Sequence, residues 1–348
     1  MEMKQLFALV EKENASDLLI GSGAPPMLRV NGQILRTKGD ALTPEASQKL
    51  IYGLLNADQK KRFEEEKELD FSFAANRKQR FRVNVYLQKG SVTAALRPIA
   101  TEIPDWKELA LPPFIEEIAM LKQGLVLVTG PTGHGKTTTQ AVIIDTVNQL
   151  RAAHVITVED PIEYVHEHKR SMVDQREVGG DTHTFLDALK YVLRQAPDVI
   201  LIGEMRDLET ISAAVRAAET GHLVLATLHT NDAVQTVDRI IDVFPAGHQQ
   251  QIRFQLSMTL VAVLSQRLLP RADGKGRVIA VELLKNTTAV SNLIREGKTH
   301  QLYSTMETSV KDGMRTMDKA VKELYMDGHI SYAEAAAHMR NPKELAGL

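Results

Sequence analysis

The feature that most restricts the fold of this chain is the stretch GPTGHGKTT at residues 130–138. It follows the apolar run LVLVT and continues into TTTQAVIIDTVNQL, a pattern typical of a helix. The stretch matches G-x-x-x-x-G-K-[ST] in full, and the order strand, loop, helix is the context in which this pattern binds nucleotide phosphates. Glycines allow backbone N–H groups to converge on phosphate oxygens, because no Cβ stands in the way. The sequence therefore predicts an α/β nucleotide-binding domain rather than a chance glycine-rich turn.

The polar residues of this loop have distinct expected roles. Lys136 is expected to reach the β- and γ-phosphates, and Thr137 to supply a hydroxyl oxygen to Mg²⁺. The residues predicted to bind the nucleotide are Gly130, Pro131, Thr132, Gly133, His134, Gly135, Lys136, Thr137 and Thr138. The predicted cofactors are ATP and Mg²⁺.

Four compact runs rich in β-branched residues follow one another from about residue 114: LVLVTG, HVITVED, DVILIGE and HLVLATLHT. Helical patterns separate them. Runs that are apolar on both faces and alternate with helices indicate a parallel sheet covered on both sides. Ligands of such sheets bind at the carboxyl ends of the strands. The loop at 130–138, the pair Glu159-Asp160, Glu204 and His229 all stand at such ends.

Carboxylates at two strand ends are candidate catalytic groups. Glu204 ends the strand in DVILIGEMRD as the acidic residue of a Walker B pattern, and it can polarise the attacking water or hold Mg²⁺ through water. The alternative is a simple strand-end cap. Glu159, Asp160 and Glu163 place three carboxylates within five residues, an unfavourable cluster unless a cation or water uses it. The alternative there is a solvated acidic loop.

Two histidines flank the last of the four runs. His222 and His229 are seven residues apart and would point to opposite faces of one strand, which argues against a metal pair. His229 falls at the carboxyl end, where a γ-phosphate sensor would sit, whereas His222 is more simply a strand-start residue. The stretch HEH at 166–168 is interpreted as a solvated loop.

The first hundred residues indicate mixed α and β structure. Apolar residues from Met3 to Val10 follow helical spacing, Asn31-Gly32 is a hairpin signal, and a helix is expected after Thr43-Pro44. Residues 70–99 suggest two or three antiparallel strands. Alternation in RFRVNVYLQ puts Arg80 and Arg82 on one face, with Phe81, Val83 and Val85 on the other.

Composition and length bound the remaining possibilities. The 348 residues suffice for two domains, the net charge of −2 gives no overall attraction to nucleic acid, and there is no cysteine. The N-terminus lacks a secretory signal pattern and no run can cross a bilayer, so a cytoplasmic protein is expected. Prolines between 98 and 113 suggest a linker. The predicted domains are 1–99, a linker at 100–113, and 114–348 with a helical bundle from about 285.

These stretches together resemble the type II/IV secretion and type IV pilus ATPases, and most closely the pilus retraction ATPases. The matching segments include ASDLLI, PPMLRVNG, RFRVNVYLQ, TVEDPIEYVH, QREVGGDT, GEMRDLETI, AAETGHLVLATLHTN and NLIREGK. The resemblance implies a PAS-like N-terminal domain joined to a RecA-like P-loop domain. It also implies a homohexameric ring at the inner face of the cytoplasmic membrane, acting on an inner-membrane platform protein and not on nucleic acid.

The resemblance further implies roles for individual residues. Glu204 and Glu163 would activate water and manage Mg²⁺ together with Thr137, and His222 and His229 would be catalytic residues of the His box. Arg80, Arg82 and Arg97 would contact a neighbouring subunit's nucleotide; the alternative for them is a solvated strand face.

Two departures from the family pattern bear on function. His134 stands where the loop usually has serine. The retraction motif, usually AIRNLIRE, is here Ala289, Val290, Ser291, Asn292, Leu293, Ile294, Arg295 and Glu296. The sequence therefore favours a motor for pilus retraction. It leaves open an assembly ATPase, an accessory retraction paralogue that works beside another retraction ATPase, a nucleic-acid translocase on the same core, and a nucleotide-gated binding module.

Overall fold

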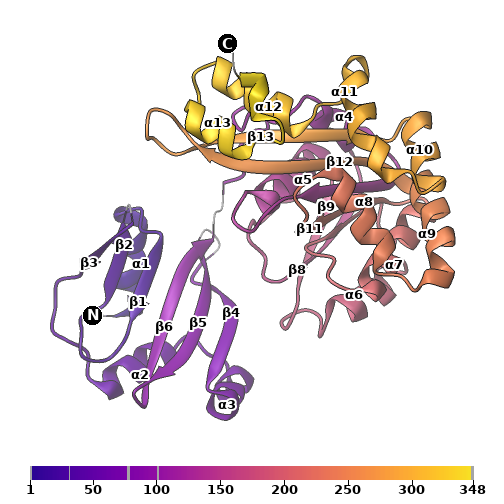
Figure 1. The fold of residues 1–348 in the computed structure, drawn as a ribbon. Coiled ribbons are helices and arrows are strands. Elements are labelled where there is room, and N and C mark those ends of the chain that lie inside the picture. The colour runs from indigo at the N-terminus through magenta and orange to yellow at the C-terminus, as the bar shows by residue number, and fades with distance from the viewer. Residues whose placement is uncertain (1, 31, 77–78, 100–101, 346–348) are drawn as a thin grey trace. The chain divides into compact units, whose positions relative to one another are not determined.

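The computed structural model describes residues 2–30, 32–76, 79–99 and 102–345, which form two compact units (Figure 1). The first unit is Met1–Glu102 with Pro161–Val165, and the second is Ile103–Asp160 with His166–Leu348.

The first unit is a six-stranded antiparallel sheet in the order β3-β2-β1-β6-β5-β4. Phe81, Val83 and Val85 are buried while Arg82 is exposed, which confirms the predicted alternation. The strands are β1 (Asp17–Ile20), β2 (Met27–Val30), β3 (Gln33–Arg36), β4 (Glu68–Ala74), β5 (Arg80–Gln88) and β6 (Ser91–Ile99). The helices are α1 (Met3–Lys12), α2 (Pro44–Tyr52) and α3 (Ala57–Glu66).

The predicted local signals in this unit have a physical basis. Leu6, Phe7 and Val10 form the buried face of α1, and the Thr43 side chain caps α2 by accepting from the N–H of Ala46. Val30 pairs with Gln33, so residues 31–32 connect β2 to β3, as a hairpin requires. Asn31 lies outside the described residues, and Gly32 has φ +81°, the left-handed conformation that glycine adopts readily.

The second unit is built on a seven-stranded sheet in the order β13-β12-β7-β11-β10-β8-β9. Neighbouring strands from β12 to β9 are parallel, and β13 is antiparallel to β12. The strands are β7 (Gly124–Thr129), β8 (His154–Glu159), β9 (Met172–Glu177), β10 (Val199–Ile202), β11 (Leu223–Leu228), β12 (Leu260–Pro270) and β13 (Arg277–Lys285). The four runs predicted as a parallel sheet are β7, β8, β10 and β11.

Helices cover both faces of this sheet, as the run pattern predicts. One face packs against α4 (Phe114–Met120) and α5 (Lys136–Leu150). The other packs against α6 (Phe185–Val192), α7 (Leu208–Glu219), α8 (Ala233–Asp242), α9 (Ala246–Thr259) and α10 (Thr288–Arg295). Strands β7, β10, β11 and β12 contribute alternate residues to the two cores, because successive side chains of a strand point to opposite faces.

The predicted C-terminal helices follow β13. They are α10, α11 (Leu302–Thr308), α12 (Met317–Met326) and α13 (Tyr332–His338). The yellow helices α12 and α13 pack on the outer part of β12 and β13 through a separate apolar cluster that includes Leu269, Ala280 and Val321 (Figure 1).

The expected linker differs in part from the structure. Residues 100–101 lie outside the described residues, but Leu111 is buried and Ile103, Trp106 and Leu109 pack against the core of the second unit. Prolines in this segment stop regular structure without preventing its apolar side chains from packing.

Candidate nucleotide-binding and hydrolysis site

The loop at residues 130–138 runs from the end of β7 to the start of α5 in a conformation that requires glycine. Gly130 has φ +142°, and a Cβ there would lie 2.4 Å from the carbonyl oxygen of Gln266. Gly133 and Gly135 have φ +78° and +82°. Three left-handed glycines so close together turn successive N–H groups toward one concave side, which is how such loops bind anions.

Lys136 lies inside this loop rather than in solvent. Its side chain is buried, and its Nζ donates to the carbonyl oxygens of Gly130 at 2.8 Å and Pro131 at 3.0 Å. It lies 3.5 Å from His229 Nδ1. The ammonium is thus held at the mouth of the loop, within reach of any phosphate bound there.

The parallel register brings the Walker B and His-box residues to this loop. Leu228 is opposite Thr129, so His229 follows β11 at the level where Gly130 follows β7. His229 Nδ1 is 3.2 Å from Thr132 Oγ1, and His229 Nε2 is 3.1 Å from Glu204 Oε1. Three residues predicted from separate motifs, Lys136, Glu204 and His229, therefore gather at one edge of the sheet.

The carboxylate of Glu204 is kept ionised by its partners. Burial favours the neutral acid, but Arg206 donates a hydrogen bond at 2.8 Å and His229 adds another contact, so the pKa of Glu204 is lowered overall. An ionised carboxylate in this position can orient a water molecule and accept its proton. Arg206 was not singled out from the sequence, although it stands two residues after Glu204.

The carboxylates of the acidic cluster at 159–163 lie in different surroundings. Glu159 is buried and accepts from Thr157 Oγ1 at 2.6 Å and Gln175 Nε2 at 3.1 Å, whereas Asp160 is exposed. Glu163 belongs to the segment grouped with the first unit, so its action at the loop stays a prediction.

His134 contacts strand β12 through its ring and its backbone. Its Nδ1 accepts from the N–H of Leu268 at 3.0 Å, and its carbonyl oxygen accepts from Gln266 Nε2 at 2.6 Å. Burial, with the positive charges of Arg277 and Lys136, lowers the pKa of its imidazole. The side chain therefore anchors the loop as a neutral acceptor.

His222 lies away from these residues. It precedes β11, and its Nδ1 is 3.0 Å from the carbonyl oxygen of Ala217. The length of β11 separates it from His229 by about 20 Å, so a catalytic role at the loop of the same chain does not fit its position. The simpler interpretation of His222 as a strand-start residue describes its contacts.

The predicted solvated loop at 166–168 needs correction at one residue: Glu167 and His168 are exposed, but His166 is not. His166 is buried, with 8 % of its surface exposed, rather than solvated. Burial lowers the pKa of its imidazole to about 4. A polar tripeptide between strands does not reveal that one of its residues is buried.

The three arginines proposed for a neighbour's site lie on β5 and β6. Arg82 and Arg97 are directly opposite each other in the register. Arg82 pairs with Asp70 at 2.6 Å, and Arg97 pairs with Asp17 at 2.9 Å. Arg80 donates to Ser72 Oγ at 3.1 Å. Both interpretations from the sequence, a solvated face and an inter-subunit contact, are compatible with these positions.

The segment at 289–296 coincides with α10. Val290 and Ile294 are buried against the sheet, and Ser291 Oγ donates to the carbonyl oxygen of Ser257 at 2.8 Å. Ser291 thereby ties α10 to α9, whereas Arg295 points toward the exposed ring of Phe254. Of the two residues that depart from the family pattern, Val290 is thus part of the core and Ser291 is a contact between two helices.

Polar residues of β12 were missed by sequence reasoning. Ser265 and Gln266 lie within β12 and are buried: Ser265 Oγ is 2.8 Å from Thr129 Oγ1, and Gln266 holds the loop through His134. The available sequence signal for these residues was the polar stretch SQR inside the apolar run LVAVLSQRLL.

Comparisons with known proteins place these features in context. The profile of the family described as "Type II/IV secretion system protein" matches residues 112–337. From Pseudomonas aeruginosa, the type IV pilus ATPase PilU is 44% identical over 99% of this chain and 90% of its own length. The type IV pilus retraction ATPase PilT of the same organism is 45% identical over 99% of both chains. A crystal structure of the pilus retraction motor PilT with bound ADP has a TM-score of 0.94 and 48% identity, covering 100% of both chains.

The described residues include no helix that is long and apolar enough to cross a membrane.

Proposed function

Because the chain belongs to the type II/IV secretion system protein family, we propose that it is an ATP-hydrolysing motor that drives type IV pilus retraction. The grouping of Lys136, Glu204 and His229 at one edge of the sheet is the observation that carries this proposal. Likeness over the full chain to a retraction motor solved with ADP supports it.

The loop would bind the β- and γ-phosphates with its backbone N–H groups and Lys136. Phosphate oxygens are charged acceptors and therefore compete well for the ammonium against the neutral carbonyls of Gly130 and Pro131. His229, beside both Lys136 and Thr132, would contact the γ-phosphate and act as the sensor of this phosphate. Glu204, ionised by its partners, would orient the attacking water and accept its proton.

Mg²⁺ fits the oxygen donors available in this chain. Thr137, Glu204 and, from the stretch TVEDPIEYVH, Glu163 offer hydroxyl and carboxylate oxygens, which are the ligands that this hard cation prefers. When bound, the ion would neutralise charge on the β- and γ-phosphates.

The assembly we propose is a homohexameric ring with domains at 1–99 and 114–348. Arg80, Arg82 and Arg97 of one subunit would stabilise charge at the neighbour's nucleotide. Arg97 suits this role because its side chain is 71% exposed and its pairing with Asp17 is a surface ion pair, which contributes little energy and exchanges readily. The ring would act at the inner face of the cytoplasmic membrane on an inner-membrane platform protein.

A second candidate is an accessory retraction motor that works beside another retraction ATPase. Two observations favour keeping it: the similarity to the relative named PilU and the replacement at Ser291. Ser291 removes a cation from α10 relative to the family pattern while adding a helix–helix hydrogen bond.

The deciding experiment counts surface pili and measures twitching in cells that carry Lys136→Ala, with the exposed Lys122→Ala as the matched control. Numerous pili without twitching support a retraction motor, because pili that cannot be withdrawn accumulate. Bald cells contradict retraction and indicate assembly. Normal pili with weakened retraction only under load indicate the accessory role.

A further inference from the structure

A row of buried polar side chains crosses three strands of the second sheet. Thr129 on β7 is opposite Ser265 on β12, which is opposite Glu282 on β13. Their exposed fractions are 0%, 0% and 1%. Residues directly opposite one another share a face of the sheet, so this row begins one residue before the phosphate-binding loop and ends at a buried carboxylate.

The first turn of α8 rests on this row. The N–H of Ala233, the first residue of α8, donates to Glu282 Oε1 at 2.8 Å. One turn later, Thr236 Oγ1 is 3.4 Å from Thr129 Oγ1 and 2.7 Å from Thr230 Oγ1. Because α8 begins four residues after His229, these contacts fix the segment that places His229 beside Glu204.

The other oxygen of the same carboxylate holds a different helix. Glu282 Oε2 accepts from the N–H of Met317, the first residue of α12, at 3.0 Å. Helix N-termini attract negative charge and present N–H groups without partners in the helix. One carboxylate therefore links the start of α8 to the start of α12.

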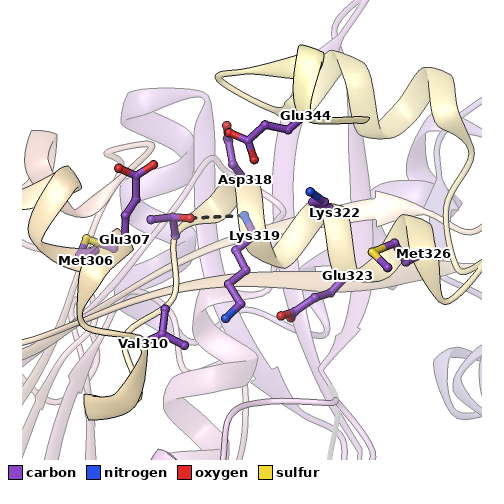
Figure 2. Close-up of a pocket in the computed structure, with 10 residues that line it drawn as sticks. Met306, Glu307, Val310, Asp318, Lys319, Lys322, Glu323, Met326 and Glu344 are labelled. Atoms are coloured by element: carbon purple, nitrogen blue, oxygen red, sulfur yellow. Dashed lines mark hydrogen bonds between the residues drawn. The ribbon is translucent and has the colours of Figure 1, made fainter. Parts of the chain in front are cut away.

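The start of α12 is also where the C-terminal segment is attached. Asp318 accepts from the N–H groups of Arg340 at 2.7 Å and Asn341 at 2.8 Å. Figure 2 shows Asp318, Lys319, Lys322 and Glu323 of α12 along a hollow of about 390 Å³ among the C-terminal helices. A shift at the start of α12 would move this surface.

We propose that Glu282 is a positioning residue that fixes the His229 segment in the site and transmits its movement on nucleotide binding to α12. The inference rests on nucleotide binding and hydrolysis in the proposed function and is independent of the pilus as the load.

Protonation of Glu282 should weaken this link, so the effect of the link should depend on pH. Burial raises the pKa of Glu282 to about 7, against the hydrogen bonds from Ala233 and Met317. Glu282 lines a second hollow, distinct from the one in Figure 2, and the other charged and titratable groups of this second hollow are Asp232, Arg267, Tyr303, Asp318, His338 and Arg340. The hydroxyl oxygen of a protonated carboxyl is a weaker acceptor than a carboxylate oxygen, so protonated Glu282 holds one of the two helices less well. In Glu282→Gln this contact is lost at every pH, because the amide nitrogen cannot accept a hydrogen bond.

The first test is the pH dependence of ATP turnover by the full-length variant Glu282→Gln. We expect kcat about tenfold below the wild type at pH 8 with little change in KM, because one charge-assisted hydrogen bond is lost. The two proteins should converge at pH 6, where Glu282 of the wild type is protonated. The control Glu307→Gln, exposed on α11, should match the wild type throughout. A ratio of variant to wild type that does not change with pH overturns the inference.

The second test measures hydrogen exchange of the Ala233 and Met317 amides with and without ADP. In the wild type, ADP should slow exchange at the starts of both α8 and α12; in Met317→Pro, the start of α8 should still respond and the rest of α12 should not. Proline is tolerated at the first position of a helix; it removes the N–H that Glu282 binds and also the buried Met317 side chain, which the control Met317→Ala removes alone. If α12 responds equally in Met317→Pro, or not at all in the wild type, the link is absent. This test needs only nucleotide binding, so it separates failure of the link from failure of hydrolysis or of the retraction role.

Discussion

The imidazole of His229 lies 3.1 Å from the carboxylate of Glu204, at the carboxyl ends of two adjacent parallel strands. The same ring reaches Thr132 of the phosphate-binding loop through its other nitrogen. One histidine therefore connects the loop that would hold the phosphates to the carboxylate that would act on water.

Replacing Glu204 by glutamine should separate hydrolysis from binding. The side-chain amide of the variant cannot accept a proton from water, so kcat should fall by about 10² to 10⁴, while affinity for ATP stays close to that of the wild type. Phosphate release and binding of a fluorescent ATP analogue measure the two effects. Glu209→Gln, exposed in the first turn of α7, is the matched control. Normal turnover by Glu204→Gln would remove Glu204 from the mechanism.

Replacing Arg206 by alanine should move the acidic limb of the pH–rate profile. Burial favours protonated Glu204, and Arg206 opposes it, so loss of Arg206 raises the pKa of this carboxyl. Because hydrolysis needs the ionised form, kcat/KM should decline at a higher pH on acidification than in the wild type. The exposed Arg216→Ala on α7 serves as the control. An unshifted limb would mean that Arg206 does not set the ionisation of Glu204.

Replacing His134 by alanine should affect stability more than nucleotide binding. The ring accepts the N–H of Leu268, and its loss leaves a partly buried donor without that partner, which costs about 1 kcal/mol. Denaturant unfolding measures the free energy, and nucleotide titration measures affinity, expected to change less than tenfold. A large loss of affinity with unchanged stability would place the ring on the phosphates instead.

Acid should destabilise the protein through His166. Its pKa is about 4 in the fold and about 6.5 when exposed, so unfolding takes up a proton between these values. The stability is complete above pH 6.5 and declines as the pH falls to 4, by about 3 kcal/mol. His166→Gln should flatten the pH dependence of the unfolding free energy in this window, and the exposed His183→Gln should not. An unchanged slope in His166→Gln would show that other groups cause the acid sensitivity.

Local patterns predict most of the fold because their physical causes are local. The strand, loop and helix around residue 130 follow from apolar runs and glycines, and the alternation of β5 follows from its period of two. The runs of β7, β8, β10 and β11 are apolar on both faces because helices cover both faces. Their carboxyl ends meet at one edge, so Lys136, Glu204 and His229 could be expected together.

Features that depend on distant partners escaped this reasoning. Nothing near Ser265 or Gln266 in the sequence indicates that Thr129 and His134 will be their partners, more than 130 residues earlier. His166 is buried, but the residues beside it in the sequence are polar and give no sign of its burial. The role of Glu282 depends on the starts of two helices that are distant in the sequence: α8 precedes Glu282 and α12 follows it.

Gly130 and Gly133 differ in what surrounds them, and this difference predicts how the loop tolerates genetic change. A methyl group at residue 130 would collide with the backbone of β12, whereas one at residue 133 would meet no atom within 4 Å. Both residues have left-handed backbones, which disfavour other amino acids by roughly 1–2 kcal/mol, but only residue 130 also requires a strand to move. A library of functional variants should therefore retain glycine at 130 almost without exception and admit asparagine or aspartate at 133.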